Sequence, residues 1–533
     1  MGSNDSAPFA SRDLRRRLPR AWRPFFGRFG NITEVQARTI PAVLDGHNVI
    51  VAAPTASGKT EAVVAPVAEL HAAQQWPGLA VVYLVPTRAL ANDLLSRLEG
   101  PLGEMYLRCE LKHGDQPVLT DGEINWLITT PESLDSLLCR RPTLFKTLRA
   151  MILDEIHLLD GTYRGDQLRV LLERLKRLTP GSSLSVHMLS ATLPDPEAVA
   201  RRYTNEFQVI AIEGARPIRV HLLQTHEQVF DLAQAQRWRK LLCFCNTRKS
   251  VEENASRLEA IWKPYPVMAH HGSLDRRHRE EAEEVMKQNP VAVCVATSTL
   301  EFGIDIGDID LVVLVEPPWS LESLQQRVGR GSRRSGTIQA AAIYQTEEER
   351  SVLELMFEAA QTGSYRSGVY RPDLSVVVQQ TLSLLYQFRA GLSRHEYLHL
   401  VGLLGAEGDI TAVLRYLKDK GYCLELGDAL YPSSDLLDIG DEGNIHSNVP
   451  DNNEYRVVDS DTGRQIGRIR GSFDEVFLLA GQSWRVIAVR GDEILAKRTP
   501  QRASAAQFGV QRNVGRFHYL LPPDLRDVRL SDH

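Results

Sequence analysis

The chain has 533 residues, a formal net charge of −5 at pH 7 and a hydrophobic content of 43%. At about 150 residues per domain this length indicates roughly three or four domains, each able to bury an ordinary core. The negative net charge argues against a protein that only coats nucleic acid. It does not exclude nucleic-acid binding, because a local groove can be basic while the rest of the surface is acidic. No apolar run reaches the ~18 residues of a membrane span, so we expect no membrane partner.

The cysteines form no Cys-x-x-Cys pair and no cluster with zinc or iron–sulfur spacing. They are Cys109, Cys139, Cys243, Cys245, Cys294 and Cys423. This usage indicates a reducing compartment, and we expect a cytoplasmic location.

A basic segment, residues 1–30, precedes the first predicted domain. Its arginines are Arg12, Arg15, Arg16, Arg17, Arg20, Arg23 and Arg28. Leu14, Leu18 and Trp22 recur at helical spacing, which predicts a short amphipathic helix, broken at Pro19, that docks on the first domain. An extra contact to nucleic acid is the alternative interpretation of this charge run.

Residues 31–215 repeat a rhythm of apolar strand, turn and helix, which predicts a doubly wound parallel sheet. The expected strands are 49–53, 80–85, 126–129, 150–154, 186–190 and 208–212. Residues 216–350 repeat this rhythm and predict a second α/β domain, joined to the first near residues 214–217. Its expected strands are 219–223, 241–245, 266–268, 292–296, 311–315 and 340–344.

The pattern changes after residue 350. Residues 351–432 look helical and suit a small winged-helix-like module. Residues 433–533 look like short strands and predict a small β-rich domain, with the clearest hairpin over residues 477–486. Within this hairpin, core packing of Trp484 is the preferred interpretation and stacking on a base is the alternative.

A candidate phosphate-binding loop follows the first predicted strand, with the sequence Ala53-Pro54-Thr55-Ala56-Ser57-Gly58-Lys59-Thr60. A loop between a strand and a helix aims its backbone N–H groups and the positive end of the helix dipole at one anion. Gly58 lets the backbone approach the phosphates, Lys59 can reach the β and γ phosphates, and the Thr60 hydroxyl can ligate Mg²⁺. Ala53 replaces the first glycine of the strict pattern.

Two carboxylates end the strand predicted over residues 150–154. Ligands of open α/β sheets bind at the carboxyl ends of the strands, where the phosphate loop also lies. Asp154 can hold Mg²⁺ there, and Glu155 can orient and deprotonate an attacking water.

A basic motif in the second α/β domain runs from Gln326 to Arg333. The spacing of Gln326, Arg330 and Arg333 predicts that they share one helix face. A solvated basic turn is one interpretation. The other is a pair of arginine fingers, Arg330 and Arg333, that reach ATP from the second domain and contribute roughly 10³–10⁵ in rate.

Further short motifs lie between these elements. They are Thr33-Glu34-Val35-Gln36, Pro86-Thr87-Arg88-Ala89-Leu90-Ala91, Thr129-Thr130-Pro131-Glu132-Ser133-Leu134, Ser190-Ala191-Thr192, Phe244-Cys245-Asn246-Thr247-Arg248, His271-Gly272-Ser273-Leu274 and Ala296-Thr297-Ser298-Thr299-Leu300-Glu301-Phe302-Gly303-Ile304-Asp305. Hydroxyl and guanidinium groups at strand ends suit a sugar–phosphate track and carry no base code. Thr130 is an expected N-cap before Pro131, and simple capping is the alternative for each threonine.

In this order, the motifs of residues 36–333 resemble those of the superfamily 2 helicases of the DEAD/DEAH-like (DExH) type. The resemblance implies ATP and Mg²⁺ as cofactors. It implies that ATP is bound by Gln36, Thr55, Ala56, Ser57, Gly58, Lys59, Thr60, Gly303, Asp305 and Gln326. It implies that hydrolysis is coupled to strand binding by His157, Ser190 and Thr192. It implies nucleic-acid contacts from Thr87, Arg88, Thr130, Asn246, Thr247, Arg248, Thr297, Ser298 and Thr299.

Within this superfamily the run from Asp154 to Gly165 looks like the large helicase-related (Lhr) branch, as do Phe473–Glu475 and Gly481–Val486. That branch implies two tandem RecA-like doubly wound parallel-sheet domains, a winged-helix module and a small β-rich C-terminal domain. The chain is shorter than the usual four-domain core. Ski-type RNA helicases are the close competitor.

The resemblance therefore implies an ATP-dependent translocase and helicase that moves 3′ to 5′ on single-stranded or tailed nucleic acid. DNA is favoured over RNA, in repair, genome maintenance or defence, and protein partners are a further option. The alternatives are a Ski-type RNA helicase and an ATP-gated clamp or remodelling subunit that separates no strands. A catalytically inactive scaffold is disfavoured because every catalytic position is filled.

Overall fold

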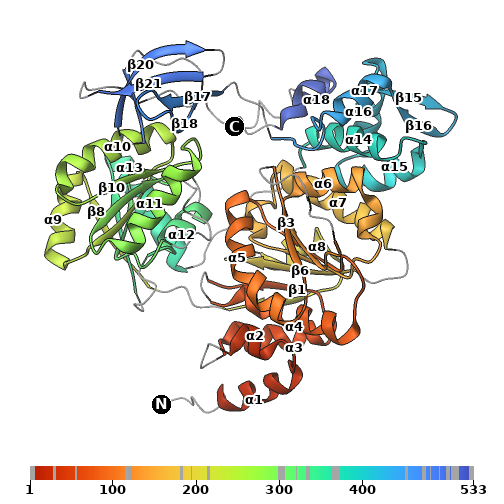
Figure 1. Cartoon of the computed structure of the whole chain (residues 1–533), viewed down its shortest axis with the longest axis horizontal. Helices are drawn as coiled ribbons and strands as arrows, with labels where there is room; N and C mark the ends of the chain where they lie inside the picture. Colours follow the sequence, from red (N-terminus) through yellow and green to blue (C-terminus); the bar gives the residue numbers. More distant parts are fainter. Residues whose placement is uncertain are drawn as a thin grey trace. The chain divides into compact units, whose positions relative to one another are not determined.

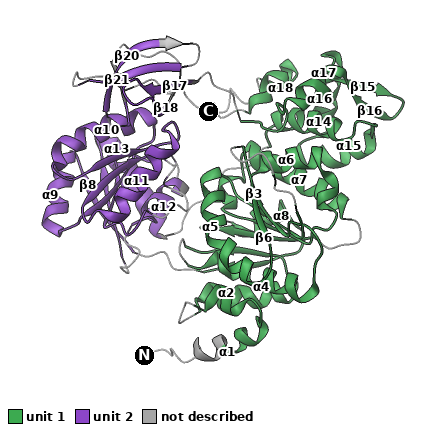
Figure 2. Ribbon diagram, in the orientation of Figure 1, with its two compact units in different colours: residues 1–213, 367–451, 512–533 green, residues 214–366, 452–511 purple. Residues whose placement is uncertain are grey.

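The computed structural model describes residues 7–27, 32–54, 57–114, 119, 122–179, 184–191, 193, 195–212, 217–297, 300, 306–319, 321–331, 337–362, 372–449, 454–470, 476–480, 482–490, 493–499, 504–505 and 515–526. They form two compact units, coloured green and purple in Figure 2. Unit 1 contains residues 1–213, 367–451 and 512–533, and unit 2 contains residues 214–366 and 452–511.

A seven-stranded parallel sheet forms the centre of unit 1, in the order β3-β4-β2-β5-β6-β1-β7 (Figure 1). The strands are β1 (Val49–Ala52), β2 (Val81–Leu84), β3 (Cys109–Lys112), β4 (Trp126–Thr129), β5 (Ala150–Leu153), β6 (Ser185–Ser190) and β7 (Gln208–Ala211). The six predicted strands of this domain are confirmed. The prediction missed β3, because this edge strand alternates polar and apolar residues instead of forming an apolar run.

Helices cover this sheet, and two further helices precede them. They are α1 (Ala7–Arg17), α2 (Trp22–Phe26), α3 (Glu34–Leu44), α4 (Lys59–Gln74), α5 (Arg88–Glu104), α6 (Pro131–Arg140), α7 (Tyr163–Leu178) and α8 (Pro196–Arg201), with 3₁₀ turns at Pro142–Phe145 and Ile156–Leu158. Leucine, isoleucine and valine side chains from α6, α7 and the strands fill one core.

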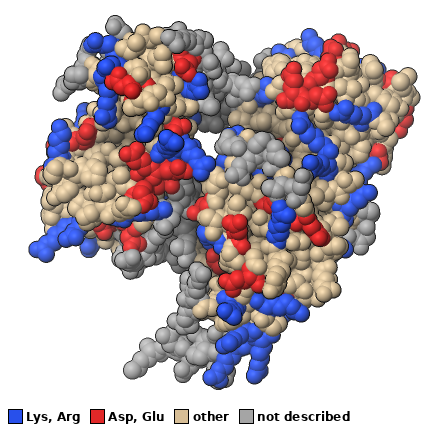
Figure 3. All heavy atoms as spheres, in the orientation of Figure 1, with Lys and Arg blue, Asp and Glu red and all other residues tan. Residues whose placement is uncertain are grey.

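The basic N-terminal segment docks on unit 1, as predicted, with a break between α1 and α2. Leu14 and Leu18 are buried, and the buried Glu69 carboxylate accepts hydrogen bonds from the backbone N–H groups of Arg20 and Ala21, both at 2.8 Å. Lys and Arg side chains gather over α1 at the lower end of the molecule in Figure 3. The exposed arginines there are Arg12, Arg15, Arg16, Arg20 and Arg23.

A helical module follows in unit 1. Its elements are α14 (Ser375–Gln387), β14 (Leu392–Ser393), α15 (Arg394–Val401), a 3₁₀ turn (Gly402–Leu404), α16 (Glu407–Asp419), β15 (Cys423–Leu426), β16 (Ala429–Pro432) and α17 (Ser434–Asp441). The three short strands pair antiparallel in the order β14-β16-β15. This succession of helix, strand, two helices and hairpin is that of a winged helix. Central helix α14 is buried almost throughout.

Within the described residues no single helix is long and apolar enough to cross a membrane. One bent pair, Arg394–Leu404 with Glu407–Asp419, meets the criteria of length and composition alone. The apolar side chains of this pair, among them Leu400, Val413 and Leu417, lie in the core of the helical module.

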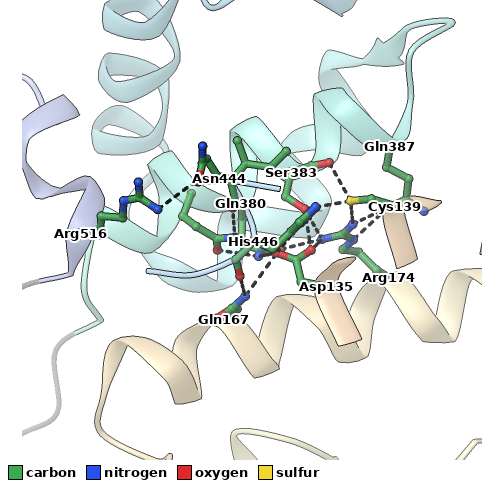
Figure 4. Close-up of polar contacts among 12 residues, drawn as sticks. Asp135, Cys139, Gln167, Arg174, Gln380, Ser383, Gln387, Asn444, His446 and Arg516 are labelled. Carbon is green, nitrogen blue, oxygen red and sulfur yellow. Dashed lines mark hydrogen bonds and ion pairs between the residues drawn. The ribbon is translucent and has the colours of Figure 1, made fainter. Parts of the chain in front are cut away.

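A buried ion pair of the first α/β domain binds polar side chains of this module (Figure 4). Arg174 of α7 donates to Asp135 of α6 at 2.6 Å, and both side chains are almost fully buried. Ser383 and Gln379 of α14 also donate to the Asp135 carboxylate, at 2.5 and 2.7 Å. Burial alone would raise the pKa of Asp135, but the Arg174 guanidinium, His446 and the Ser383 hydroxyl together outweigh burial and hold this pKa well below its usual range.

His446 completes this polar network. Its Nδ1 lies 3.9 Å from the Asp135 carboxylate, and ligand-type atoms of Asp135, Cys139 and His446 all lie within 4.8 Å of one another. Arg174 donates to both Asp135 and Cys139, so a cation already occupies this cluster and a metal ion would be repelled. Burial lowers the pKa of His446, but Asp135 and Cys139 together outweigh burial and raise the pKa to about 9.

Unit 2 is built on a six-stranded parallel sheet in the order β10-β11-β9-β12-β13-β8. Its strands are β8 (Ile218–Leu223), β9 (Lys240–Phe244), β10 (Val267–His270), β11 (Ala292–Ala296), β12 (Leu311–Leu314) and β13 (Ile338–Ile343). Its helices are α9 (His226–Gln236), α10 (Arg248–Trp262), α11 (Arg276–Gln288), α12 (Leu321–Val328) and α13 (Glu347–Thr362). The six predicted strands are confirmed.

A second sheet in unit 2 comes from the C-terminal part of the chain, in the order β18-β17-β21-β20-β19-β22. Its strands are β17 (Glu454–Asp459), β18 (Gln465–Arg470), β19 (Val476–Leu479), β20 (Gln482–Arg490), β21 (Glu493–Arg498) and β22 (Ser504–Ala505). The hairpin of β19 and β20 is confirmed. Trp484 is 5% exposed, and its indole N–H donates to the Leu479 carbonyl at 2.8 Å. It shares one core with the α/β sheet of this unit, which confirms core packing as the interpretation of this residue.

The structure divides residues 433–533, which the sequence assigns to one domain, between the two units. Helix α17, the 3₁₀ turn Arg516–Leu520 and α18 (Pro523–Arg526) lie with the helical module in unit 1. Phe517 and Leu520 pack in the module's core, and Asn448 donates to Ser375 of α14 at 2.8 Å. Only the strands β17–β22 belong to unit 2. The difference arises because Ile445, Phe517 and Leu520 are buried in the core of the module and Asn448 is bound to α14.

Replacing Arg174 with Met should destabilise unit 1 by about 3–5 kcal/mol, because buried Asp135 would lose its directly paired guanidinium and keep only the more distant His446 as a cation. Urea unfolding followed by tryptophan fluorescence measures this loss. Arg201→Met is the matched control, since the Arg201–Glu197 pair is exposed and such pairs contribute at most about 1 kcal/mol. Equal free energies of unfolding for the two variants would contradict the proposed contribution of the buried Arg174–Asp135 pair to stability.

The raised pKa of His446 predicts a pH dependence of stability. A group whose folded pKa is raised contributes stability that is fully present below its unfolded pKa, 6.5, and is lost as the pH rises through about 9. Wild-type protein should therefore lose up to about 3 kcal/mol between pH 6 and pH 9.5 from this group. In His446→Gln this part of the loss should vanish, and parallel melting curves of both proteins against pH would refute the assignment.

Candidate ATP site and nucleic-acid contact residues

The phosphate loop leads from β1 into α4 with a conformation that requires glycine. Gly58 has φ = +85°, and a Cβ built on it would lie 2.3 Å from Nε2 of Gln36. Gly58 is the N-cap of α4 and offers no side-chain acceptor, so it caps none of the first N–H groups of this helix. Those groups suit an anion, as predicted for residues 57–60. Thr55 and Ala56 lie outside the described residues.

Gln36 lies against this loop. Thr33 and Gln36 form a capping box at the start of α3, in which Thr33 N–H donates to Gln36 Oε1 at 3.0 Å. The amide Nε2 of Gln36 donates to the Gly58 carbonyl at 3.4 Å. The side chain is therefore fixed beside the phosphate loop.

Lys59 is almost fully buried, and its ammonium group lies between the ends of two strands. Its Nζ donates to the carbonyls of Ala53 at 2.8 Å and of Ser190 at 2.9 Å. The lysine therefore bridges the loop after β1 and the end of β6. The charge stands at the carboxyl edge of the sheet, where a phosphate is expected.

The two predicted Mg²⁺ ligands meet at a residue that the prediction missed, Tyr83 of β2. Its hydroxyl donates to Asp154 Oδ2 at 2.8 Å and also hydrogen-bonds the Thr60 side chain. Burial, followed by the charge of Glu155, raises the pKa of Asp154 to about 6. Burial and Asp154 also raise the pKa of Tyr83, which stays a donor. The sequence offered one sign of the role of Tyr83, since it is the only polar side chain of the apolar strand Val81–Leu84.

Glu155 and the predicted coupling residues form a second contact group. Glu155 has the left-handed φ of 45°, which turns the chain at the end of β5. His157 Nδ1 lies 2.8 Å from Ser190 Oγ and 3.5 Å from Glu155 Oε2. The structure thus brings His157, Ser190 and Glu155 together. Thr192 lies outside the described residues.

The predicted nucleic-acid contacts of unit 1 occupy the ends of the paired strands β2 and β4. Thr87 caps α5 by accepting from Leu90 N–H at 3.3 Å. Thr130 is the N-cap residue of α6 but makes no side-chain cap bond, so the start of that helix keeps N–H groups that suit a phosphate. Arg88 lies over Gly114: a Cβ built on this glycine would lie 2.6 Å from Nη2 of Arg88.

In unit 2 Asn246 binds protein groups at both ends of its amide. Its Nδ2 donates to the Pro317 carbonyl at 2.8 Å, and its Oδ1 accepts from Arg327 at 2.9 Å. Arg327, which the prediction missed, is buried and also lies over the Phe244 ring. Asn246 therefore joins the end of β9 to the loop after β12. In the sequence, the position of Arg327 beside Gln326 in the basic motif could have pointed to this residue.

The other predicted residues of unit 2 lie at helix starts or inside the domain. Thr247 caps α10 by accepting from Ser250 N–H at 3.1 Å, and Arg248 is the first residue of that helix. Thr297 follows β11 and is 8% exposed. Ser298, Thr299, Gly303, Asp305 and Arg333 lie outside the described residues.

The predicted shared helix face of Gln326 and Arg330 is wrong. Helix α12 ends at Val328, and Arg330 N–H donates to the Arg327 carbonyl in a tight turn. Gln326 is therefore helical, whereas Arg330 lies in the turn after the helix and is 2% exposed. The glycines Gly329 and Gly331 explain the early helix end, because glycine has low helix propensity.

The C-terminal sheet holds the loop of the His271-Gly272-Ser273-Leu274 motif. Buried Glu252 pairs with His271 Nε2 at 2.7 Å and accepts from Ala480 N–H at 2.7 Å. Asp275 N–H donates to the Ile466 carbonyl of β18 at 3.0 Å. A Cβ on Gly467 would lie 2.6 Å from the Ser273 carbonyl, so only glycine permits this approach. The sheet and the loop thus form one body.

Family comparisons agree with this arrangement. The family model of the DEAD/DEAH box helicases matches residues 33–199, and the model of the helicase conserved C-terminal domain matches residues 223–335. The fold and the site define the class: the chain belongs to the DEAD/DEAH box helicases, whose two conserved domains it carries in order. Both α/β domains are RecA-like.

Among these helicases the chain is similar to Lhr. It is 26% identical to ATP-dependent helicase Lhr-Core of Saccharolobus solfataricus, covering 89% of this chain and 61% of the relative. It is 28% identical to Lhr-Core protein 2 of Thermococcus barophilus, covering 89% and 63%. The chain thus spans about three fifths of the length of these curated relatives.

Solved structures show the same likeness. Mycobacterium smegmatis helicase Lhr, bound to single-stranded DNA and AMP-PNP, superposes with a TM-score of 0.70 at 26% identity, covering 82% of this chain and 63% of that chain. The helicase MrfA, bound to DNA, superposes with a TM-score of 0.72 at 20% identity, covering 91% and 69%, and shows a shared fold alone.

Proposed function

We propose that the chain is an ATP-dependent translocase and helicase that moves 3′ to 5′ on single-stranded or tailed DNA, in repair, genome maintenance or defence. The observation that carries the proposal is the group at the carboxyl edge of the first sheet. There Lys59 lies at the end of the phosphate loop, and Asp154 and Glu155 follow strand β5. His157 connects Glu155 to Ser190. The cytoplasmic location inferred from the cysteines stays a prediction.

The first domain supplies the groups that hydrolysis needs. N–H groups at the start of α4 and the Lys59 ammonium would bind the phosphates of ATP. Thr60 and Asp154 would hold Mg²⁺, which neutralises phosphate charge when bound. Asp154 fits this role because its raised pKa reflects burial and the Glu155 charge, which a divalent cation would offset. Glu155 would accept the proton of the attacking water.

The second domain would complete the site. Gln326, Gly303 and Asp305 would contribute to ATP binding, and Arg330 and Arg333 would stabilise the charge of the transition state. Burial of Arg330 in its turn favours a defined side-chain position over a free solvated one. Hydrolysis that needs arginines from a second domain depends on the approach of that domain, as a translocase requires.

Contacts to the nucleic acid would come from strand ends in both domains. In the first domain they are Thr87, Arg88 and Thr130, and in the second Thr247, Arg248, Thr297, Ser298 and Thr299. Hydroxyls and free N–H groups bind phosphates without base preference, which suits movement over any sequence. The similarity to Lhr, which was solved with single-stranded DNA, favours DNA.

The ATPase rate with poly(dT), with poly(U) and without nucleic acid, at one stated low salt concentration, tests this function. Stimulation by poly(dT) alone supports the DNA translocase, and unwinding of a 3′-tailed but not a 5′-tailed duplex supports the direction. Stimulation by poly(U) alone would favour a Ski-type RNA helicase. Stimulation without strand displacement would favour an ATP-gated clamp.

Glu155→Gln should lower kcat for ATP by about 10²–10⁴-fold, because the general base is lost. Single-strand binding should be retained, since the proposed strand contacts are elsewhere. Lys59→Ala should weaken ATP binding as well. Steady-state ATPase assays and anisotropy of a labelled strand measure both effects, and Glu173→Gln, at a partly exposed position of α7, is the control. Wild-type turnover in either variant would exclude the assigned site.

Tyr83→Phe should raise the Mg²⁺ concentration for half-maximal ATPase activity by about 10-fold or more. The phenylalanine keeps the packing but removes the hydroxyl that orients Asp154, and loss of such a partner typically weakens metal sites by 10–100-fold. A Mg²⁺ titration at saturating ATP measures the change. An unchanged Mg²⁺ requirement would separate Tyr83 from the metal site.

A further inference from the structure

Trp319 is an exposed aromatic side chain in the loop that follows β12. It is 77% exposed, and among the large apolar side chains of the described residues only Tyr106 is more exposed. Tryptophan is rarely left so open to water, because its ring buries a large apolar area when it packs. An exposed tryptophan on a defined loop therefore indicates a surface that binds something.

The loop that presents Trp319 is held firmly. The Glu316 carboxylate accepts hydrogen bonds from Asn246 N–H at 2.8 Å and from the Ser250 hydroxyl. Asn246 Nδ2 donates to the Pro317 carbonyl at 2.8 Å, and Pro317 and Pro318 restrict the backbone further. The ring is thus carried by an ordered segment, so binding to it would cost less entropy than binding to a free loop.

The position of this loop in the sheet links it to the proposed strand contacts. Strands β11, β9 and β12 are parallel neighbours, and Phe244 of β9 is paired with both Ala296 and Leu314. Their carboxyl ends therefore lie at one edge, about 4.8 Å apart from strand to strand. Thr297 follows β11, residues 246–248 follow β9, and Trp319 stands five residues after the end of β12.

The chemistry of the three loops is complementary. Thr297, Thr247 and Arg248 offer a hydroxyl or guanidinium to phosphates but no flat apolar surface to a base. An indole ring provides that surface, and stacking tolerates every base because each has a π-face. A sequence-independent translocase needs such a contact.

We propose that Trp319 stacks on a nucleobase of the bound single strand and that Asn246 is a positioning residue, which holds the Glu316–Trp319 loop in place. The proposal deepens the proposed function and rests on it. It assigns a base-binding site to a domain for which only phosphate contacts were expected. It also gives Asn246 a role through protein contacts in place of the predicted contact to nucleic acid.

Binding of a fluorescent oligo(dT) and of an abasic strand of equal length, at one salt concentration, tests the stacking. Trp319→Ala should weaken oligo(dT) binding by between about 5-fold and about 100-fold, the usual value of one stacked base. Binding of the abasic strand should change less than 2-fold. Trp319→Phe should keep most of the affinity for oligo(dT), whereas Trp319→Leu should lose it. Asn246→Ala should reproduce the loss on oligo(dT) more than on the abasic strand.

Two controls keep the result interpretable. Tyr106→Ala removes the most exposed aromatic side chain among the described residues, which lies just after α5 in unit 1, and should leave both affinities unchanged. Thermal melting of each variant checks folding, and Trp319→Phe remains informative if the alanine variant is unstable.

The outcomes separate this proposal from the proposed function. If the wild-type protein binds no single strand, the proposed function fails. If the wild-type protein binds and Trp319→Ala binds oligo(dT) equally well, the stacking is overturned and the function stands. Equal losses on oligo(dT) and on the abasic strand would also overturn the stacking, because they would indicate a structural or backbone contact.

Discussion

Parallel pairing of the strands is the constraint on which the site depends. In a parallel sheet every carboxyl end emerges at the same edge, so residues far apart in the chain meet there without any other device. Lys59 follows β1 and donates to the carbonyl of Ser190 at the end of β6. Glu155 follows β5 and is connected to Ser190 through His157. The same constraint in unit 2 collects Asn246, Thr297 and the loop before Trp319 at one edge.

Buried carboxylates fasten the C-terminal part of the chain to the two α/β domains. Asp135 anchors the helical module in unit 1 through Arg174 and the polar side chains of α14. Glu252 anchors the C-terminal sheet in unit 2 through His271 and the Ala480 N–H group. Each carboxylate is fully paired, as burial of a charge demands. The two C-terminal modules are therefore parts of different units.

Several expected contact residues also make contacts within the protein. Thr87 and Thr247 satisfy N–H groups at helix starts, as the capping alternative anticipates. The side-chain amide of Asn246 donates to the Pro317 carbonyl and accepts from Arg327. Motif residues can thus fix the loops that carry the proposed contacts, and Tyr83 in the same way holds Asp154, a proposed Mg²⁺ ligand.

The sequence by itself determined the two α/β domains, twelve of their thirteen strands and the phosphate loop, because buried parallel strands are continuous apolar runs and the loop has a strict local pattern. Strand β3 was missed because its residues, Cys109–Lys112, alternate between polar and apolar and form no such run. Only the tertiary structure decided the partners Tyr83, Arg327 and Glu252, and the division of residues 433–533 between two units. Such pairings depend on which buried polar groups meet in space, and no spacing along the chain records that.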